Sequence, residues 1–219
     1  MGRRVSGDGP RIGVLGGTFD PPHLGHLWLA TLVADALALE RVLFMPAAEP
    51  PHKRREAVTD AATRVAMTRL AIRGNELFEM STIELDRSGP SFTVDSVVQL
   101  LGQYPAPARL FLVLAADSLA QIGSWREPDR LLELIEWAVG PRSGVSLGDR
   151  SALRSRFGAA AERIHLLDGP ALDISSSQVR ERVAAGRSIR YLVPRAVEEL
   201  ISDRRLYRGP AATRSADPG

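Results

Sequence analysis

Cysteine is absent from the 219 residues of the chain. Its absence excludes disulfide bonds, thiolate metal ligands and thiol nucleophiles, so any chemistry must use other side chains. Long hydrophobic runs are also absent, because the longest apolar stretch, residues 27–39, is interrupted by Thr31 and Asp35. This stretch is too short and too polar to span a membrane, and residues 1–10 lack the apolar segment of a secretory signal. We therefore expect a soluble, cytoplasmic protein that does not contact membranes.

The sequence also lacks an excess of one charge sign. Lysine and arginine number 28, aspartate and glutamate number 26, and no long block of like charge occurs. Aromatic residues make up only 5% of the chain and are not interleaved with a basic stripe. A nucleic-acid-binding module needs such a stripe, so we expect no nucleic-acid partner, whereas small anionic ligands remain open.

Short apolar runs alternate with helical patterns along most of the chain. Strands are expected at residues 11–15, 41–45, 77–85, 109–114, 136–140 and 163–167. Helices are expected between most of them, including residues 23–39, 60–73 and 93–104. Repeated strand–helix–strand units predict an α/β, Rossmann-like, doubly wound fold with a mostly parallel sheet and helices on both faces.

This pattern also predicts the domain organisation. We expect one domain at residues 11–208, between a flexible N-terminus at residues 1–10 and a disordered tail at residues 209–219 that is rich in Ala, Pro, Gly and Ser. Ligands of doubly wound sheets bind beyond the carboxyl ends of the strands, so the loops there are the first place to look for a site.

The segment GGTFDPPHLGH follows the first expected strand. It matches neither G-x-G-x-x-G nor the P-loop pattern, which disfavours hydride-transfer Rossmann enzymes and P-loop ATPases. Gly16 and Gly17 allow a ligand to approach the backbone, and Pro22 suits the first position of a helix whose free N–H groups would face an anion. His23 and His26 share one helix face, so both can donate to the same phosphate chain.

GTFDPPHLGH closely resembles the G-[ST]-F-D-P-x-H-x-G-H signature of the nucleotidyltransferase superfamily that carries an HxGH motif. The resemblance implies that His23 and His26 hold the phosphates of ATP and stabilise the charge that develops as pyrophosphate leaves. It implies that Gly25 lets the ligand lie against the helix. The other ATP-binding residues that it implies are Gly16, Gly17, Thr18 and Phe19.

Pro-His-Lys at residues 51–53 follows the second expected strand. A lysine or histidine on a loop can clamp phosphates as a point charge, although a solvated basic loop is the plainer interpretation. The segment resembles the corresponding one of nicotinate-nucleotide adenylyltransferases. That resemblance implies a catalytic Lys53 and a mononucleotide-binding His52.

The segment DISSSQVR predicts a helix start with a capping box, in which Ser175 pairs with Gln178. Capping does not account for the further hydroxyls and the guanidinium on the first turn, which suit a polyphosphate. The segment resembles the superfamily's I-S-[SAT]-[ST]-x-[IV]-R motif. The resemblance assigns the β- and γ-phosphates of ATP to Ser176, Ser177 and Arg180, with Arg180 counted as catalytic.

Three features relate to the second substrate or its neighbourhood. DRSGPSFTVD resembles a segment particular to the nicotinate branch, and helix N-terminal amides near Thr93 suit a pyridine carboxylate. AADS resembles the family's G-A-D-[SAN], which places Asp117 on a ribose hydroxyl of ATP, although Ala115 stands in the usual glycine position. Trp125 lies eight residues after Asp117, where the family has a tryptophan that stacks on nicotinate; a core tryptophan is the alternative.

The resemblance covers residues 11–208, with further landmarks at RSG (142–144), YLVP (191–194) and LYR (206–208). It implies transfer of the adenylyl group of ATP to nicotinate mononucleotide, which gives nicotinate adenine dinucleotide and pyrophosphate in NAD biosynthesis. Mg²⁺ is expected mainly on the ATP phosphates, with no protein metal site. A homo-oligomer is compatible with the sequence.

Two other classes compete with this interpretation. Phosphopantetheine adenylyltransferases share the first motif, but they are usually shorter and lack the DRxGxSFT segment; cytidylyltransferases are a further cousin. A non-catalytic nucleotide-binding protein on the same fold would be expected to have lost a histidine or Arg180, and this chain retains His23, His26 and Arg180.

Overall fold

The computed structural model describes residues 9–49, 58–87 and 89–208, and every structural statement below concerns those residues. The Pro-His-Lys segment with His52 and Lys53, the tail at residues 209–219 and most of residues 1–10 lie outside them. What the sequence predicts for these segments therefore stays a prediction.

Six strands form one sheet in the order β3-β2-β1-β4-β5-β6, and each neighbouring pair is parallel. Their bounds are β1 Arg11–Gly17, β2 Arg41–Pro46, β3 Phe78–Met80, β4 Arg109–Ala115, β5 Glu136–Gly140 and β6 Ile164–Leu166. The central strands are buried along nearly their whole length, as parallel strands covered on both faces must be. The Rossmann-like, doubly wound fold is confirmed.

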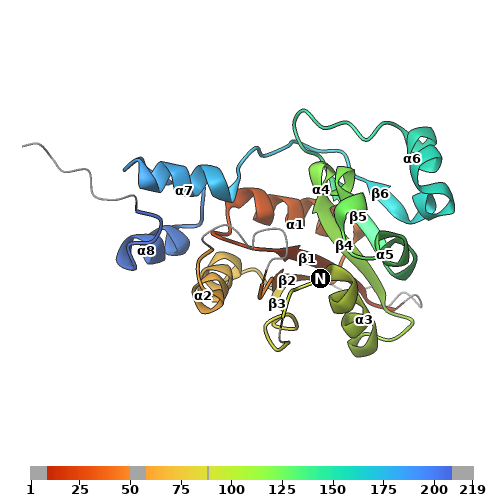
Figure 1. Ribbon diagram of the computed structural model, residues 1–219, viewed down its shortest axis with the longest axis horizontal. Coiled ribbons are helices and arrows are strands. Elements are labelled where there is room, and N and C mark those ends of the chain that lie inside the picture. The colour runs from red at the N-terminus through yellow and green to blue at the C-terminus, as the bar shows by residue number, and fades with distance from the viewer. Residues whose placement is uncertain (1–8, 50–57, 88, 209–219) are drawn as a thin grey trace, which may run out of the picture.

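Helices cover both faces of the sheet (Figure 1). On one face α1 (Leu24–Leu37) buries Ala30, Val33 and Ala34 against the strands. On the other face α3 (Thr93–Gln103) buries Val94, Val97 and Leu100. The elements that share this second face are α4 (Ala116–Ala120), η2 (Ile122–Ser124), α5 (Pro128–Leu134), α6 (Arg150–Phe157) and η3 (Gly158–Arg163).

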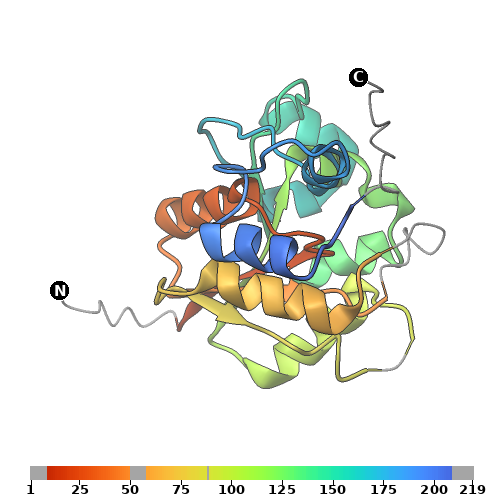
Figure 2. The ribbon, with the colours of Figure 1, turned by 90° about the vertical axis from the view of Figure 1, so that its left-hand side faces the viewer.

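The last two helices form a separate layer at one end of the molecule. α7 (Ser176–Ala184) and α8 (Arg195–Asp203), blue in Figures 1 and 2, lie beside α1 and α2 (Ala61–Ile72). Met67 of α2, Val179 of α7 and Val197 of α8 meet in a third apolar cluster. This cluster fixes the start of α7 close to the loop that follows β1.

Two local predictions were wrong. The expected strand at residues 77–85 ends at Met80, because Leu85 and Asp86 both donate to the Thr82 carbonyl and close a turn instead. Pro22 is not the first residue of a helix: α1 begins at Leu24, because His23 is extended and serves as the N-cap. The other expected strands and helices agree with the observed ones to within about two residues.

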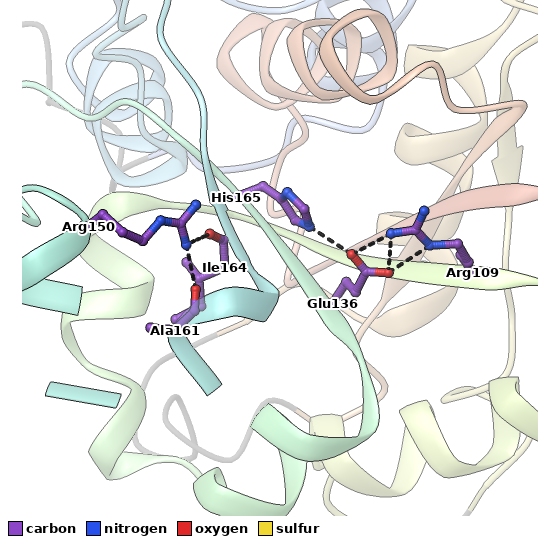
Figure 3. A network of polar contacts seen from close by, with 6 residues as sticks. All are labelled: Arg109, Glu136, Arg150, Ala161, Ile164 and His165. Carbon is purple, nitrogen blue, oxygen red and sulfur yellow. Dashed lines mark hydrogen bonds and ion pairs between the residues drawn. The ribbon is translucent and has the colours of Figure 1, made fainter. Parts of the chain in front are cut away.

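A polar cluster joins the amino ends of β4 and β5 to β6, far along the strands from their carboxyl ends. Glu136 accepts hydrogen bonds of 2.8 and 2.9 Å from Arg109, and its Oε2 lies 2.7 Å from His165 Nε2 (Figure 3). Arg150, in the same view, donates to two backbone carbonyls at the entry to β6. The cluster ties three parallel strands together at this edge of the sheet.

Within the described ranges, none of the helices is both long and apolar enough to cross a membrane.

Candidate active site

A cavity of about 500 Å³ opens at the carboxyl ends of β1 and β4. These two strands are neighbours in the sheet, and the strand order reverses between them. Ligands of doubly wound folds bind at such a reversal, and the volume is in the range of small-molecule sites. The structure thus puts a cavity at the place that the sequence predicts.

Most of the predicted site residues line this cavity. They are Gly16, Gly17, Thr18, His23, Gly25, His26, Thr93, Asp117, Trp125, Ser176 and Ser177. Phe19 and Arg180 are not part of the lining, whereas His52 and Lys53 lie outside the described residues. Segments that are far apart in sequence therefore converge on one space.

The two histidines of the first motif lie in direct contact at the start of α1. Their ring centroids are 3.7 Å apart with an interplanar angle of 28°. The backbone N–H of His23 donates to His26 Nδ1 at 3.2 Å. A neutral imidazole has one acceptor and one donor nitrogen, so this bond puts the proton of neutral His26 on Nε2.

His23 is buried, with only 6% of its surface exposed. Burial, together with the positive charge of Arg142, lowers the pKa of His23 to about 4. His23 is therefore neutral at pH 7, and it can offer one N–H without a formal charge. Its Nδ1 has no hydrogen-bond partner within the described part of the chain. An unpaired polar atom in such a buried position is costly to the fold.

Gly25 is needed for close packing at the helix start. A β-carbon there would lie 3.0 Å from His23 Nδ1 and 3.3 Å from the Leu172 carbonyl oxygen.

The first backbone N–H of α1, that of Leu24, is already bonded to the Leu192 carbonyl at 2.9 Å. Fewer amides at this helix start are therefore open to an anion than the sequence predicts.

Phe19 packs against the site from the core of the protein. Its side chain is buried, its ring meets the His26 ring edge-on at 5.0 Å, and it also packs on Phe44. The sequence resemblance counts Phe19 among the ATP-binding residues, but its side chain lies in the core. Packing against the imidazole is the contribution that the geometry supports.

The first turn of α7 is docked on the loop between β1 and α1. Arg180 Nη1 donates to the Asp20 carbonyl at 2.8 Å, and Nη2 donates to Ser177 Oγ at 3.2 Å. Ser176 Oγ donates to the Pro21 carbonyl at 2.8 Å. Two of the predicted phosphate-binding side chains thus hold the loop that leads into His23. The capping box of α7 is confirmed as well.

Asp20 is a second fixed point of the same loop. Its buried carboxylate accepts a hydrogen bond of 2.6 Å from the Tyr207 hydroxyl and one of 3.2 Å from the Thr59 backbone N–H. Burial and the bond to Asp20 raise the pKa of Tyr207, so its hydroxyl stays a donor. The end of the described chain thereby anchors a loop near its start.

Arg64 is a site-supporting residue that the sequence analysis missed. It is 1% exposed, and its guanidinium donates to the carbonyls of Thr18, Ala48 and Thr59 at 2.8, 2.9 and 2.9 Å. It clamps the loops after β1 and β2 to the start of α2. One signal was available: Arg64 falls in helical register with buried Met67 on the core face of α2.

Arg142 and Trp28 also line the cavity, although the sequence did not predict a role for either in the site. Arg142, known from the sequence only as part of a landmark, lies 3.6 Å from Asp117 and 3.9 Å from Asp173. It adds positive charge next to His23. Trp28 lines the cavity from α1, and its Nε1 donates to the Pro170 carbonyl at 2.7 Å, which ties down the segment that leads to α7.

A different wall of the cavity consists of the start of α3 and the turn after α4. Thr93 is the first residue of α3, and Trp125 is half-buried with its ring centroid 6.4 Å from that of Trp137. Glu84 lies on this cavity too, where burial raises its pKa and Ser96 Oγ donates to it at 2.6 Å. The wall combines an aromatic face, a helix start and one buried carboxyl group.

The described residues contain no group of three or more His, Asp or Glu side chains placed to hold a metal ion. The carboxylates of Asp117 and Asp173 pair with Arg142 instead.

Comparisons with known proteins identify the family and the fold. The family model described as cytidylyltransferase-like matches residues 14–182. The Roseiflexus sp. protein named "Probable nicotinate-nucleotide adenylyltransferase" is 48% identical over 197 residues, which cover 90% of this chain and 98% of the relative. The Thermomicrobium roseum protein of the same name is 43% identical over 198 residues, covering 90% and 92%.

The fold is also that of a solved structure. Plasmodium falciparum nicotinic acid mononucleotide adenylyltransferase, complexed with NaAD, superposes with a TM-score of 0.76 at 19% identity, covering 90% of this chain and 97% of that one. Its likeness supports the fold, and the identity with the bacterial relatives supports the family. The chain therefore belongs to the cytidylyltransferase-like family and, within it, to the nicotinate-nucleotide adenylyltransferases.

Proposed function

We propose that this protein transfers the adenylyl group of ATP to nicotinate mononucleotide, giving nicotinate adenine dinucleotide and pyrophosphate. The observation that carries this function is the convergence of three segments on one cavity: the stacked pair His23 and His26, the serine-rich start of α7, and the wall with Trp125. The first two suit a polyphosphate, and the third suits a flat heterocycle.

The chemistry needs no general base. The second pKa of a phosphate monoester is about 6, so the 5′-phosphate of the mononucleotide is mostly dianionic at neutral pH. One of its oxygens attacks the α-phosphorus of ATP, a new P–O bond forms, and the bond to the bridging oxygen of the β-phosphate breaks. The electron pair leaves with pyrophosphate. Catalysis then consists of alignment and charge stabilisation.

The residues present suit that task. The Nε2–H of His26 and the N–H of neutral His23 supply short-range donors at the start of α1. Arg142 adds a cation beside them. Arg180 lies one helical turn into α7, where it donates to a carbonyl oxygen and a hydroxyl oxygen, both neutral acceptors that a ligand could replace. An ATP phosphate would compete well for Arg180, because it carries the opposite charge and can accept two parallel hydrogen bonds from the guanidinium, which a carbonyl cannot. Lys53 stays a prediction.

The described residues fit an Mg²⁺ ion that is held mainly by the ATP phosphates. They supply no three-ligand cluster, and the carboxylates of Asp117 and Asp173 face Arg142. Mg²⁺ is commonly bound through substrate phosphates and few protein ligands. When bound, it would neutralise phosphate charge. A homo-oligomer and a cytoplasmic location stay predictions from the sequence.

Release of pyrophosphate tests this function. The assay uses the full chain with ATP, Mg²⁺ and one acceptor at a time: nicotinate mononucleotide, nicotinamide mononucleotide or phosphopantetheine. We expect nicotinate mononucleotide to give the highest kcat/KM. A higher kcat/KM with phosphopantetheine would assign the alternative adenylyltransferase activity, and ATP binding without release of pyrophosphate for any acceptor would indicate a non-catalytic nucleotide-binding protein.

A further inference from the structure

Arg126 lies on the wall of the cavity that includes Trp125 and the start of α3. Its Cζ is 4.6 Å from the centroid of the Phe92 ring, and Phe92 is the N-cap residue of α3. Arg126, Phe92, Thr93 and Trp125 all line the cavity. The guanidinium of Arg126 thus lies on the same wall of the cavity as the indole of Trp125, on which a pyridine ring could stack.

The guanidinium of Arg126 is only loosely paired within the protein. Its Nε lies 3.5 Å from Glu127 Oε1, whereas Arg130 Nη1 lies 2.8 Å from Glu127 Oε2 and is the closer partner of that carboxylate. The side chain of Arg126 is 52% exposed. Among the described residues, no other ion pair engages Arg126, so its terminal nitrogens can meet an anion.

A planar guanidinium is matched to a carboxylate, because its parallel N–H groups can donate to both oxygens. The Cζ of Arg126 lies over the Phe92 ring in a cation–π contact, and Arg126 lines the cavity, so the guanidinium is positioned beside the space that a ligand would fill. A carboxamide offers one acceptor oxygen, and its NH₂ donors would face the donors of the arginine. A guanidinium in this position would therefore bind the acid of a pyridine ring better than the amide.

We propose that Arg126 is a specificity-determining residue that binds the pyridine carboxylate and favours nicotinate over nicotinamide mononucleotide. This inference rests on the proposed function. It extends the sequence prediction, which gave the carboxylate only to amides at the start of α3. The other anion of the substrate, the 5′-phosphate, is common to both mononucleotides, so a guanidinium bound there would not discriminate.

The test is kcat/KM for nicotinate and nicotinamide mononucleotide at saturating ATP, in the wild type, Arg126→Gln, Arg126→Lys and Arg130→Gln. Arg130→Gln is the matched control, because it removes the same charge and the other partner of Glu127 without touching the cavity. We expect Arg126→Gln to lower kcat/KM about tenfold or more for the acid and less than about twofold for the amide. Arg126→Lys should lie between, and Arg130→Gln should match the wild type.

Each other outcome overturns the inference. Equal losses for both mononucleotides in Arg126→Gln would place Arg126 on the phosphate, and an unchanged kcat/KM for both would remove it from recognition. The same fall in Arg130→Gln would reveal a general charge effect. If the wild type turns over nicotinate mononucleotide but Arg126→Gln has the same acid-to-amide ratio of kcat/KM as the wild type, this inference alone is overturned. If the wild type does not turn over nicotinate mononucleotide, the proposed function is overturned as well. Thermal unfolding of each variant shows that it is folded.

Discussion

The guanidinium of Arg180 donates a 2.8 Å hydrogen bond to the backbone carbonyl of Asp20, which lies 160 residues earlier in the chain. The bond docks the first turn of α7 on the loop that leads into His23. Both segments that are expected to bind phosphates are thereby held in one arrangement. Since the acceptor is a neutral carbonyl, a phosphate can replace it.

Arg180→Lys should weaken ATP binding by about tenfold or more and leave the mononucleotide within about twofold. A lysine has one ammonium in place of a planar fork, so it cannot reproduce paired hydrogen bonds to phosphate oxygens. Calorimetric titration of each ligand separately measures the effect. Arg182→Lys, on the same helix but bonded to the Ser188 carbonyl, is the control and should bind both ligands normally. Equal weakening of both ligands by Arg180→Lys would place Arg180 elsewhere.

His26→Ala should reduce turnover by about two orders of magnitude or more while the protein stays folded. It removes an Nε2–H donor at the start of α1 together with the acceptor of the His23 backbone N–H. Steady-state assay of pyrophosphate release measures the loss. His165→Gln alters a histidine at the far end of the sheet and should leave turnover unchanged. Normal turnover in a folded His26→Ala protein contradicts the phosphate role.

His23 should make the free energy of unfolding depend on pH. Its pKa is about 4 in the folded protein against an ordinary 6.5, so between these values the unfolded chain binds a proton that the folded chain does not. The part of the free energy of unfolding that depends on neutral His23 is fully present above pH 6.5. It is lost as the pH falls toward 4, by on the order of 3 kcal/mol in all.

Urea unfolding at pH 7 and pH 5 measures this effect in the wild type and in His23→Asn. Asparagine cannot titrate, so the difference in stability between wild type and variant should shift against the wild type at pH 5. A difference that is the same at both pH values would show that the pKa of His23 is not lowered.

Trp125→Ala should raise KM for both mononucleotides and spare the KM for ATP. Stacking of a base on an aromatic side chain contributes roughly 1 to 3 kcal/mol and does not depend on whether the ring carries an acid or an amide. Trp125→Phe retains part of the face and serves as the graded comparison. If Trp125→Ala chiefly impairs ATP, the indole belongs to the adenine side of the cavity.

Glu136→Gln should lower the free energy of unfolding at pH 7 by about 1 to 3 kcal/mol, because Arg109 and His165 lose a charged partner. Burial opposes ionisation of Glu136, yet its hydrogen bonds from His165 and Arg109 lower its pKa below 4.5. Its contribution is therefore complete above pH 4.5 and is lost as the pH falls through the folded pKa.

Catalytic efficiency should stay within about twofold of the wild type in Glu136→Gln, since Glu136 starts β5 and the cavity lies at the other end of the strands. Chemical unfolding and the pyrophosphate assay on the same preparation measure both quantities. A large loss of kcat/KM with little loss of stability would connect this cluster to the site.

The sequence by itself determined the sheet and the local motifs. Buried parallel strands are continuous apolar runs, and helix caps are relations between residues three apart, so both are legible in a short window. His23, His26 and the capping box of α7 are where these patterns predict them. The strand expected at residues 77–85 is in fact only Phe78–Met80, because a short window does not reveal the turn that closes on the Thr82 carbonyl.

Only the tertiary structure decided which side chains support and complete the site. Arg64 holds two loops, Arg180 holds the Asp20 carbonyl, and Arg126 stacks on Phe92. A guanidinium looks the same in sequence whether it is solvated, buried on carbonyls or aimed into a cavity. Its partner is chosen by the packing of elements that lie tens to more than a hundred residues apart, and no local pattern encodes that choice.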